Sequence, residues 1–564
     1  MSNQPSNTPK VPRGITLSRI QNFIFNGQFE SMGLSSQLWK HRRGGDPTVT
    51  IAVYSVPELK HAISHTFHPT TPGKENFGPS WSTHWFRIHV TVPEEMEGER
   101  VFFQWKLGCE GMVWSKEGVP LQGLSEQERF EYLLTDKAKT GTKYEFYIEA
   151  ACNGISGVGT GNMVPDPNRF YSIAVADLVV RNQAAFDLYY DMIIIKGIAT
   201  DGHQESQRAR DALYVANEVI NTYVVGSVDS MLECRKLTTE FLKQKNGTGQ
   251  HMVTAVGNCH IDTAWLWPYD ETKRKVARSW SSQLALMNRY STYIFTASQA
   301  QQYEWLLEYY PALFEQIRQK VAFGQWELIG GVNRDFMRST LKRELMSFGF
   351  LIPLVRLAPL LHPYPKSMYS SFKYYWRIFT GYSGQLPQVL KQSGIKYFFT
   401  QKLSWNNINK FPHTTFWWTG IDGSRVLAHL PPADTYVGQV NTSELYNCVS
   451  NHKDIDLSNE SLLAFGHGDG GGGPTYGMLE RLMRLSDVSD LPKCKPGRVK
   501  DFFERVDTNA KPLNAYKGEL YFELHRGTYT TQALVKKGNR KGELLLRDLE
   551  FLAAIADHKI KDYV

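Results

Sequence analysis

The chain has 564 residues, of which 42% are hydrophobic, 21% charged and 13% aromatic. This length predicts roughly three to five structural units and excludes a small disulfide scaffold, while the composition excludes a mostly disordered chain. The six cysteines never occur as CxxC, which argues against a cysteine zinc site and favours a reducing compartment.

The net charge of +7 is concentrated in one segment. Residues 336–400 contain nine Lys or Arg and one Glu, which accounts for the whole excess of positive charge. These basic residues are interleaved with apolar runs, so the charge does not predict a nucleic-acid partner. The polar N-terminus lacks the apolar core of a secretory signal, and no long apolar run follows, so we expect a soluble protein made in the cytosol with no membrane partner.

The first part of the chain is predicted to be a tail followed by a β-rich module. Residues 1–25 are rich in Ser, Asn, Pro and Gln and predict a loose polar tail. Residues 26–180 contain runs of alternating apolar residues, such as WSTHWFRIHVTVP and KYEFYIEA, separated by Gly, Pro and charged turns. This alternation predicts a β-sandwich or jelly roll.

The rest of the chain predicts a multidomain α/β protein. Residues 181–248 have apolar residues at helical spacing and predict a helical linker. Residues 249–500 alternate apolar strands with helical patterns, which predicts a catalytic domain with a parallel sheet, doubly wound or barrel-like, whose ligand site lies at the carboxyl ends of the strands. Residues 501–564 turn helical and stop without a cap or breaker, and we interpret them as the start of a truncated C-terminal helical bundle.

The run HIDTAWLWP follows a predicted buried strand directly. Residues i and i+2 of a strand share a face, so His260 and Asp262 present an imidazole and a carboxylate together, a plausible half of a zinc site. Trp265 and Trp267 offer flat apolar faces for a sugar ring. The alternative is a neutral His–Asp pair that caps the following helix.

Two further motifs contain chemically active residues. In GHGDGGGGP, the glycines allow close approach of a ligand and hold Asp469 on a turn, where burial would suit it to general-acid work. A phosphate loop is a competing interpretation that lacks the GK[ST] ending, and a flexible surface loop is another. His525, in LHRGTY, is a structural histidine unless it serves as a distant partner of His260 and Asp262.

Several long blocks resemble a known family when taken together. VGNCHIDTAWLWPYDETKRKVARSWSSQLALM, TASQAQQYEWL, GQWELIGG, TQKLSWNNINKFPHTTFWW, GSRVLAHLPPADTY, FGHGDGGGGPT and ELHRGTYTTQA are similar, in this order, to the family 38 glycoside hydrolases, and more specifically to the cytosolic and vacuolar α-mannosidases. The resemblance extends to the β-rich module at about residues 75–125. It implies a zinc-dependent retaining α-mannosidase that removes terminal α-linked mannose from oligomannosides in the cytoplasm or vacuole.

The resemblance also implies roles for particular residues. It makes His260, Asp262 and His525 ligands of Zn²⁺, or of another divalent ion, and Asp469 the general acid/base. It implies an oligomannoside substrate and leaves open assembly into a homo-oligomer.

One segment departs from the family pattern. Alignment on GYS places Ile378 where the nucleophilic aspartate belongs, and no Asp occurs between Asp335 and Asp422. The resemblance stops after Val332 and returns at Gly381, so residues 333–380 have the character of a shifted reading frame or misplaced exon boundary. We therefore expect impaired hydrolysis from the chain as written, with a non-catalytic zinc- or mannoside-binding relative as the alternative.

Overall fold

The computed structural model describes residues 12–329 apart from 26, 28, 127 and 158–163, and then residues 374–376, 381–392 and 394–559. The chain divides into two compact units, each of which is described by itself below. The first comprises Met1–Ala297, Trp305–Glu327 and Pro431–Phe502, and the second comprises Ser298–Glu304, Leu328–Leu430 and Phe503–Val564.

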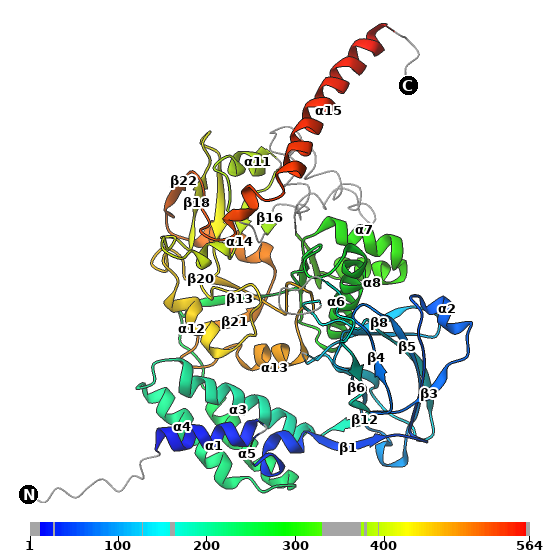
Figure 1. Ribbon diagram of the computed structural model, residues 1–564. Helices are drawn as coiled ribbons and strands as arrows, with labels where there is room; N and C mark the ends of the chain where they lie inside the picture. Colours follow the sequence, from blue (N-terminus) through cyan, green and yellow to red (C-terminus); the bar gives the residue numbers. More distant parts are fainter. Residues whose placement is uncertain are drawn as a thin grey trace, which may run out of the picture. The chain divides into compact units, whose positions relative to one another are not determined.

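An antiparallel β-sandwich begins the first unit (Figure 1). One sheet has the strand order β1-β12-β6-β9 and the other β3-β2-β5-β10-β7-β8. Alternate residues of the longer inner strands enter one core, as Phe86, Ile88 and Val90 do on β5, which explains the alternation in the sequence. The bounds are β1 (Trp39–Gly44), β2 (Val49–Tyr54), β3 (His68–Thr70), β5 (His84–Thr91), β6 (Val101–Lys106), β7 (Gly111–Trp114), β8 (Pro120–Leu124), β9 (Glu131–Thr135), β10 (Lys143–Ala150) and β12 (Val175–Arg181), with the short pair β4 (Asn76–Phe77) and β11 (Tyr171–Ser172) beside them.

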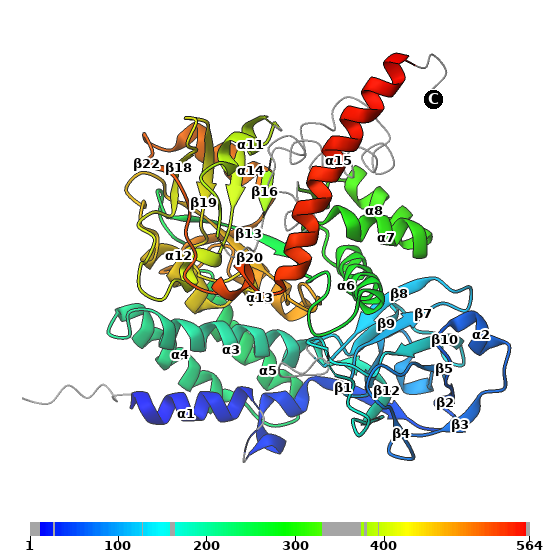
Figure 2. The ribbon, with the colours of Figure 1, turned by 45° about the horizontal axis from the view of Figure 1, so that its top comes forward.

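Four helices of the first unit lie side by side (Figure 2). They are α1 (Arg13–Ile24), α3 (Gln183–Asp201), α4 (Gln207–Thr222) and α5 (Val228–Leu242). The last three begin at Asn182, Ser206 and Ser227, whose side chains accept hydrogen bonds from the first turn. Part of the expected polar tail is helical, because residues 20, 23 and 24 of α1 recur at helical spacing and are buried.

A parallel sheet forms the third part of the first unit. Its order is β15-β14-β13-β20, and β21 also pairs with β13. Parallel strands leave their carboxyl ends at one edge, and α6 packs against β8 of the sandwich. The elements are β13 (Met252–Asn258), α6 (Tyr269–Arg289), β14 (Phe295–Ala297), α7 (Ala300–Tyr309), α8 (Pro311–Ala322), β15 (Trp326–Leu328), α12 (Thr442–Ser450), β20 (Glu460–Phe465), α13 (Tyr476–Arg484), β21 (Lys493–Pro496) and α14 (Val499–Asn509). Of these, α7, β15 and α14 include residues that are counted with the second unit.

The second unit contains a five-stranded sheet with the order β16-β17-β19-β18-β22. Its core includes Phe398, Trp418 and Phe522, all fully buried. The elements are β16 (Tyr374–Trp376), α11 (Leu386–Gln392), β17 (Tyr397–Phe399), β18 (Thr415–Thr419), β19 (Arg425–His429), β22 (Ala515–Lys517) and α15 (Ala533–Lys559). A sandwich, a parallel α/β part and a C-terminal helix confirm the predicted fold class. Across the described residues, we find no helix with the length and hydropathy needed to span a membrane.

Candidate functional site

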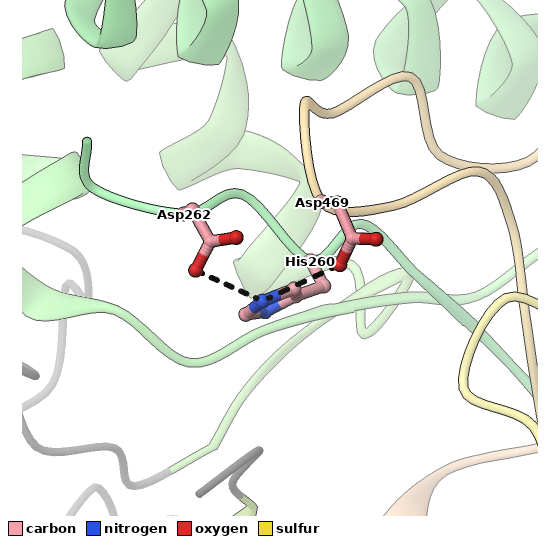
Figure 3. A group of neighbouring side chains, drawn as sticks. All are labelled: His260, Asp262 and Asp469. Atoms are coloured by element: carbon pink, nitrogen blue, oxygen red, sulfur yellow. Dashed lines mark ion pairs between the residues drawn. The ribbon is translucent and has the colours of Figure 1, made fainter. Parts of the chain in front are cut away.

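The two residues predicted to bind a metal come directly after the buried strand β13. His260 Nε2 lies 3.6 Å from Asp262 Oδ1, and the two side chains face each other in Figure 3. Their exposed fractions are 17% and 18%, so both are partly shielded from water while remaining accessible. The end of β13 at Asn258 therefore places an imidazole and a carboxylate together at the carboxyl edge of the parallel sheet.

Asp469 joins this pair from the glycine loop, which we define as residues 466–474. The loop follows β20, which runs parallel to β13, so both strands deliver their following residues to the same edge. Asp469 Oδ1 lies 4.0 Å from His260 Nε2. The Asp262 backbone N–H donates to the Asp469 carbonyl oxygen at 2.8 Å, and an antiparallel bridge joins Ile261 to Gly470. The two segments are thus fixed to each other by their backbones.

The three side chains form a potential metal-binding group. One ligand atom from each of His260, Asp262 and Asp469 lies within 4.8 Å of the other two. Among the described residues, no other group of three His, Cys, Asp or Glu side chains meets this condition. One imidazole nitrogen and two carboxylate oxygens are a donor set that suits Zn²⁺ and other divalent ions.

Tyr436 completes the cluster and was not identified from the sequence. Its O–H donates to Asp469 Oδ1 at 2.7 Å, and its ring lies edge-on to His260 with centroids 5.6 Å apart. Burial, together with the carboxylates of Asp469 and Asp262, raises the pKa of Tyr436, so the phenol keeps its proton and remains a donor. The only sequence signal was its position at the end of the block GSRVLAHLPPADTY, seven residues after the histidine that ends β19.

The backbone of Asp469 is in the left-handed region, with φ of 63°. A side chain at positive φ is crowded by its own backbone, and non-glycine residues adopt this region mainly where the surroundings force them to. The carboxylate that contacts His260 is therefore held at the expense of local backbone strain. Such strain is concentrated at functional sites in proteins.

The glycines after Asp469 allow close contact with other protein atoms. A Cβ atom added at Gly470 would collide with the carbonyl oxygen of Ile155, and one at Gly471 would collide with Ser279 Oγ. The loop amides are also engaged, because the N–H groups of Gly470, Gly472 and Gly473 donate to Gly468 O, Ser279 Oγ and His467 O. These amides are not directed at a ligand, which argues against a phosphate loop, and the packing argues against a flexible surface loop.

The two predicted sugar-binding tryptophans differ in exposure. Trp265 is 44% exposed, whereas Trp267 is 4% exposed and its indole N–H donates to Thr272 Oγ1 at 3.0 Å. The two indole rings meet edge-to-face with their centroids 6.0 Å apart. The Lys275 ammonium lies over the Trp267 ring, 4.7 Å from its centroid. Trp265 therefore presents an accessible face, and Trp267 packs behind it.

Two sequence-predicted positions are not among the described residues of the first unit. His525 belongs to the second unit, where it is exposed, has φ of 56°, and contacts Phe522 and Trp405. Ile378, with nearly all of segment 333–380, lies outside the described residues. The role predicted for each remains a prediction.

Family models match both the sandwich and the α/β region. Residues 47–179 match a model described as the jelly roll domain of alpha-mannosidase. Residues 250–336 and 368–519 match the N-terminal domain of glycosyl hydrolases family 38. Residues 337–367, within the segment expected to be aberrant, lie between the two matched stretches.

Curated relatives match nearly the whole chain. Alpha-mannosidase G of Dictyostelium discoideum is 40% identical over 96% of this chain and 50% of its own length. Alpha-mannosidase 2C1 of Homo sapiens is 39% identical over 96% of this chain and 52% of its own length. An alpha-mannosidase of Saccharomyces cerevisiae is 39% identical over 85% of this chain and 46% of its own length. The chain thus spans about half the length of these relatives.

Proposed function

Because the chain belongs to glycoside hydrolase family 38, we propose that the protein is an α-mannosidase-like hydrolase of terminal α-linked mannose in oligomannosides. The observation that carries this proposal is the convergence of His260, Asp262 and Asp469 at the carboxyl edge of the parallel sheet. The substrate class comes from relatives whose names describe alpha-mannosidases and which are about twice as long as this chain.

Zn²⁺ is the metal that we propose for the site, with another divalent ion as the alternative. Ligand atoms about 2.0–2.2 Å from a tetrahedral zinc ion are about 3.4 Å from one another. The 3.6 Å separation of His260 Nε2 and Asp262 Oδ1 fits this requirement. We assign these two residues as ligands, and His525 as a third from the family resemblance. A bound ion supplies Lewis-acid polarisation of neighbouring mannose hydroxyls.

Asp469 is the residue that we propose as general acid/base. Its side chain is 38% exposed, so a substrate can reach it. Tyr436 donates to Oδ1, which leaves Oδ2 as the atom that carries a proton to the glycosidic oxygen. The strained backbone and the phenol together fix the direction of this carboxylate.

The sugar ring is proposed to lie against Trp265, with Trp267 supporting that side chain from behind. An oligomannoside is thus the expected partner, with neither nucleic acid nor membrane, and assembly into a homo-oligomer is a further proposal. We place the protein in the cytoplasm, with the vacuole as the alternative.

Catalysis by retention needs a second carboxylate about 5–5.5 Å from the acid. The resemblance puts Ile378 at this position, and Ile378 lies within the stretch 368–519 that the family model matches, so the model aligns this position and it holds no carboxylate. We therefore propose that hydrolysis is impaired in the chain as written. Ile378 favours the second candidate function, a relative that binds zinc or mannosides without turnover.

The test combines zinc titration by calorimetry, binding of a mannose-like iminosugar, and hydrolysis of 4-nitrophenyl α-mannoside with and without a chelator. Hydrolysis that a chelator abolishes and Asp469→Asn lowers by at least about 100-fold supports an active α-mannosidase. Binding of zinc or the iminosugar without turnover supports the second candidate. Absence of both binding and turnover would overturn the proposed function.

A further inference from the structure

A side chain of the β-sandwich donates a hydrogen bond to the glycine loop, which contains Asp469. Arg129 lies between β8 and β9 and is 6% exposed. Its Nη1 donates to the carbonyl oxygen of Gly472 at 3.1 Å, across 343 positions of sequence. Its Nε and Nη2 donate to Ser125 Oγ at 3.2 and 2.9 Å, which fixes the guanidinium to its own turn. The sandwich therefore contributes a rigid donor to the glycine loop.

Burial of the Arg129 guanidinium removes a charged group from water, which is energetically unfavourable. Among the described residues, no carboxylate forms a direct ion pair with Arg129, and burial lowers its pKa although the more distant Glu110 offsets part of the effect. A buried cation without a paired anion requires well-formed hydrogen bonds. The bonds to Gly472 and Ser125 meet this requirement, so the side chain and the loop depend on each other.

Side chains of α6 and Tyr293 also hold Gly472. The Gly472 N–H donates to Ser279 Oγ at 2.9 Å, and Gln283 Nε2 donates to the Gly472 carbonyl oxygen at 2.9 Å. Tyr293 O–H donates to Gln283 Oε1 at 2.7 Å, which fixes the amide orientation. The carbonyl of Gly472 thus accepts one bond from the sandwich and one from the helix.

A second segment of the sandwich, at Ile155, packs against the glycine loop next to Asp469. Gly470 lies so close to the carbonyl oxygen of Ile155 that only glycine fits there. That carbonyl accepts a hydrogen bond from Lys275 Nζ of α6 at 3.0 Å. Lys275 in turn pairs with Glu110 of the sandwich at 2.5 Å, with both side chains almost completely buried.

We propose that Arg129 is a positioning residue of the site, acting through Gly472 to hold Asp469 against His260. The proposal rests on the function proposed above for this cluster. Displacement of the glycine loop also reaches the metal-binding pair, because Asp262 N–H bonds to Asp469 O and Ile261 pairs with Gly470. The β-sandwich is therefore part of the scaffold of the active site.

The test compares Arg129→Met and Arg129→Lys with Arg208→Met in the full chain. Arg208 is a matched control, since it is 8% exposed, has no described ion pair, and donates to Phe241 O at 3.0 Å and Gln244 Oε1 at 2.7 Å in the helical layer. Unfolding in urea measures the general loss of stability in each variant. Hydrogen–deuterium exchange of peptides covering residues 466–474 measures loop order, and calorimetry measures the zinc Kd.

We expect Arg129→Met to speed exchange in the glycine loop and to weaken zinc binding by about 10- to 100-fold, the range found for partners that orient metal ligands. Arg129→Lys, which keeps one donor, should lie between Met and wild type. Arg208→Met should leave both readouts unchanged. Unchanged exchange and zinc Kd in a folded Arg129→Met variant, or equal changes in Arg208→Met, would overturn the inference.

Failure of the proposed function has a different signature. If the wild-type chain binds no zinc, the metal assignment fails, whereas exchange of the glycine loop still measures the effect of Arg129. If Arg129→Met does not fold, Arg129→Lys decides the question by the same exchange measurement.

Discussion

Tyr436 and Asp469 are joined by a 2.7 Å hydrogen bond from the phenol O–H to Oδ1. The two partners differ in exposure, because the tyrosine is 5% exposed and the aspartate side chain is 38% exposed. The buried phenol is therefore a fixed point from which the accessible carboxylate is oriented. This relationship predicts that the two residues are energetically coupled.

The coupling is measured by a double-mutant cycle with Tyr436→Phe and Asp469→Ala. A hydrogen bond to a charged group contributes about 1.5–3 kcal/mol when buried, and we expect about 1 kcal/mol here because Asp469 is partly exposed. Urea unfolding of the four proteins gives the interaction energy. Tyr214→Phe, at a tyrosine that is 53% exposed, serves as control. An interaction energy near zero would show that the bond does not form in solution.

Backbone strain at Asp469 gives a second prediction. Asp469→Gly and Asp469→Ala both remove the carboxylate, but only glycine adopts φ of 63° without crowding. We expect the glycine variant to be more stable than the alanine variant by about 1 kcal/mol. Both variants should lose any hydrolytic activity. Equal stability in urea would mean that the left-handed conformation is relaxed in solution.

The metal assignment predicts different effects at the three clustered residues. His260→Ala and Asp262→Ala should each weaken zinc binding by more than about 100-fold, because loss of a ligand exceeds the roughly 10- to 100-fold effect of an orienting partner. Asp469→Asn should stay within about 10-fold of wild type if Asp469 is the acid and not a ligand. Calorimetric titration distinguishes these outcomes, with His61→Ala on the exposed surface of the sandwich as control. Strong zinc binding without His260 would contradict the assignment.

The grouping of His260, Asp262 and Asp469 could be predicted because these residues follow two apolar strands. The buried runs before His260 and Asp469 form parallel neighbours, and their carboxyl ends meet at one edge. Tyr436 escaped prediction because it lies on an irregular loop with no periodic signal. Arg129 escaped because its contact with Gly472 spans 343 positions and is set by packing between the sandwich and α6.

The different exposure of Trp265 and Trp267 could not be predicted from the sequence either. Both tryptophans occupy one short loop, and only the tertiary structure shows that Thr272 and Lys275 of α6 enclose one of them. The helix α1 was missed for a related reason. Its three buried apolar residues are spread through a polar stretch and gain their meaning from the helices against which they pack.

Buried histidines predict loss of stability in acid. Burial lowers the pKa of His251 to about 4 and also lowers that of the neighbouring His452. A histidine whose pKa is lower in the folded state than its ordinary value near 6.5 binds protons preferentially after unfolding, so stability is full above pH 6.5 and falls as the pH drops toward 4. We expect a loss of about 2 kcal/mol from His251 between pH 7 and pH 5.

Urea unfolding at several pH values measures this loss. His251→Gln, which keeps a donor for Ser461, should reduce the pH dependence, whereas His61→Gln should not. A pH dependence that is the same in His251→Gln as in wild type would exclude His251 as its source.

The last prediction concerns the segment that departs from the family. Residues 336–400 contain nine basic residues and one acidic residue, and the family model passes over 337–367 while matching on both sides. A diverged but functional domain would be expected to keep a composition typical of folded domains. A shifted reading frame would instead change the composition abruptly at two boundaries. We expect the transcript across codons 325–390 to encode a polar block ending in an aspartate of the WLPD type, and protein made from it to hydrolyse 4-nitrophenyl α-mannoside in a chelator-sensitive manner. A transcript that encodes Ile378 as written would leave the proposed site without the nucleophile that the resemblance implies, and the same assay should then show no turnover, while calorimetry still detects zinc or iminosugar binding.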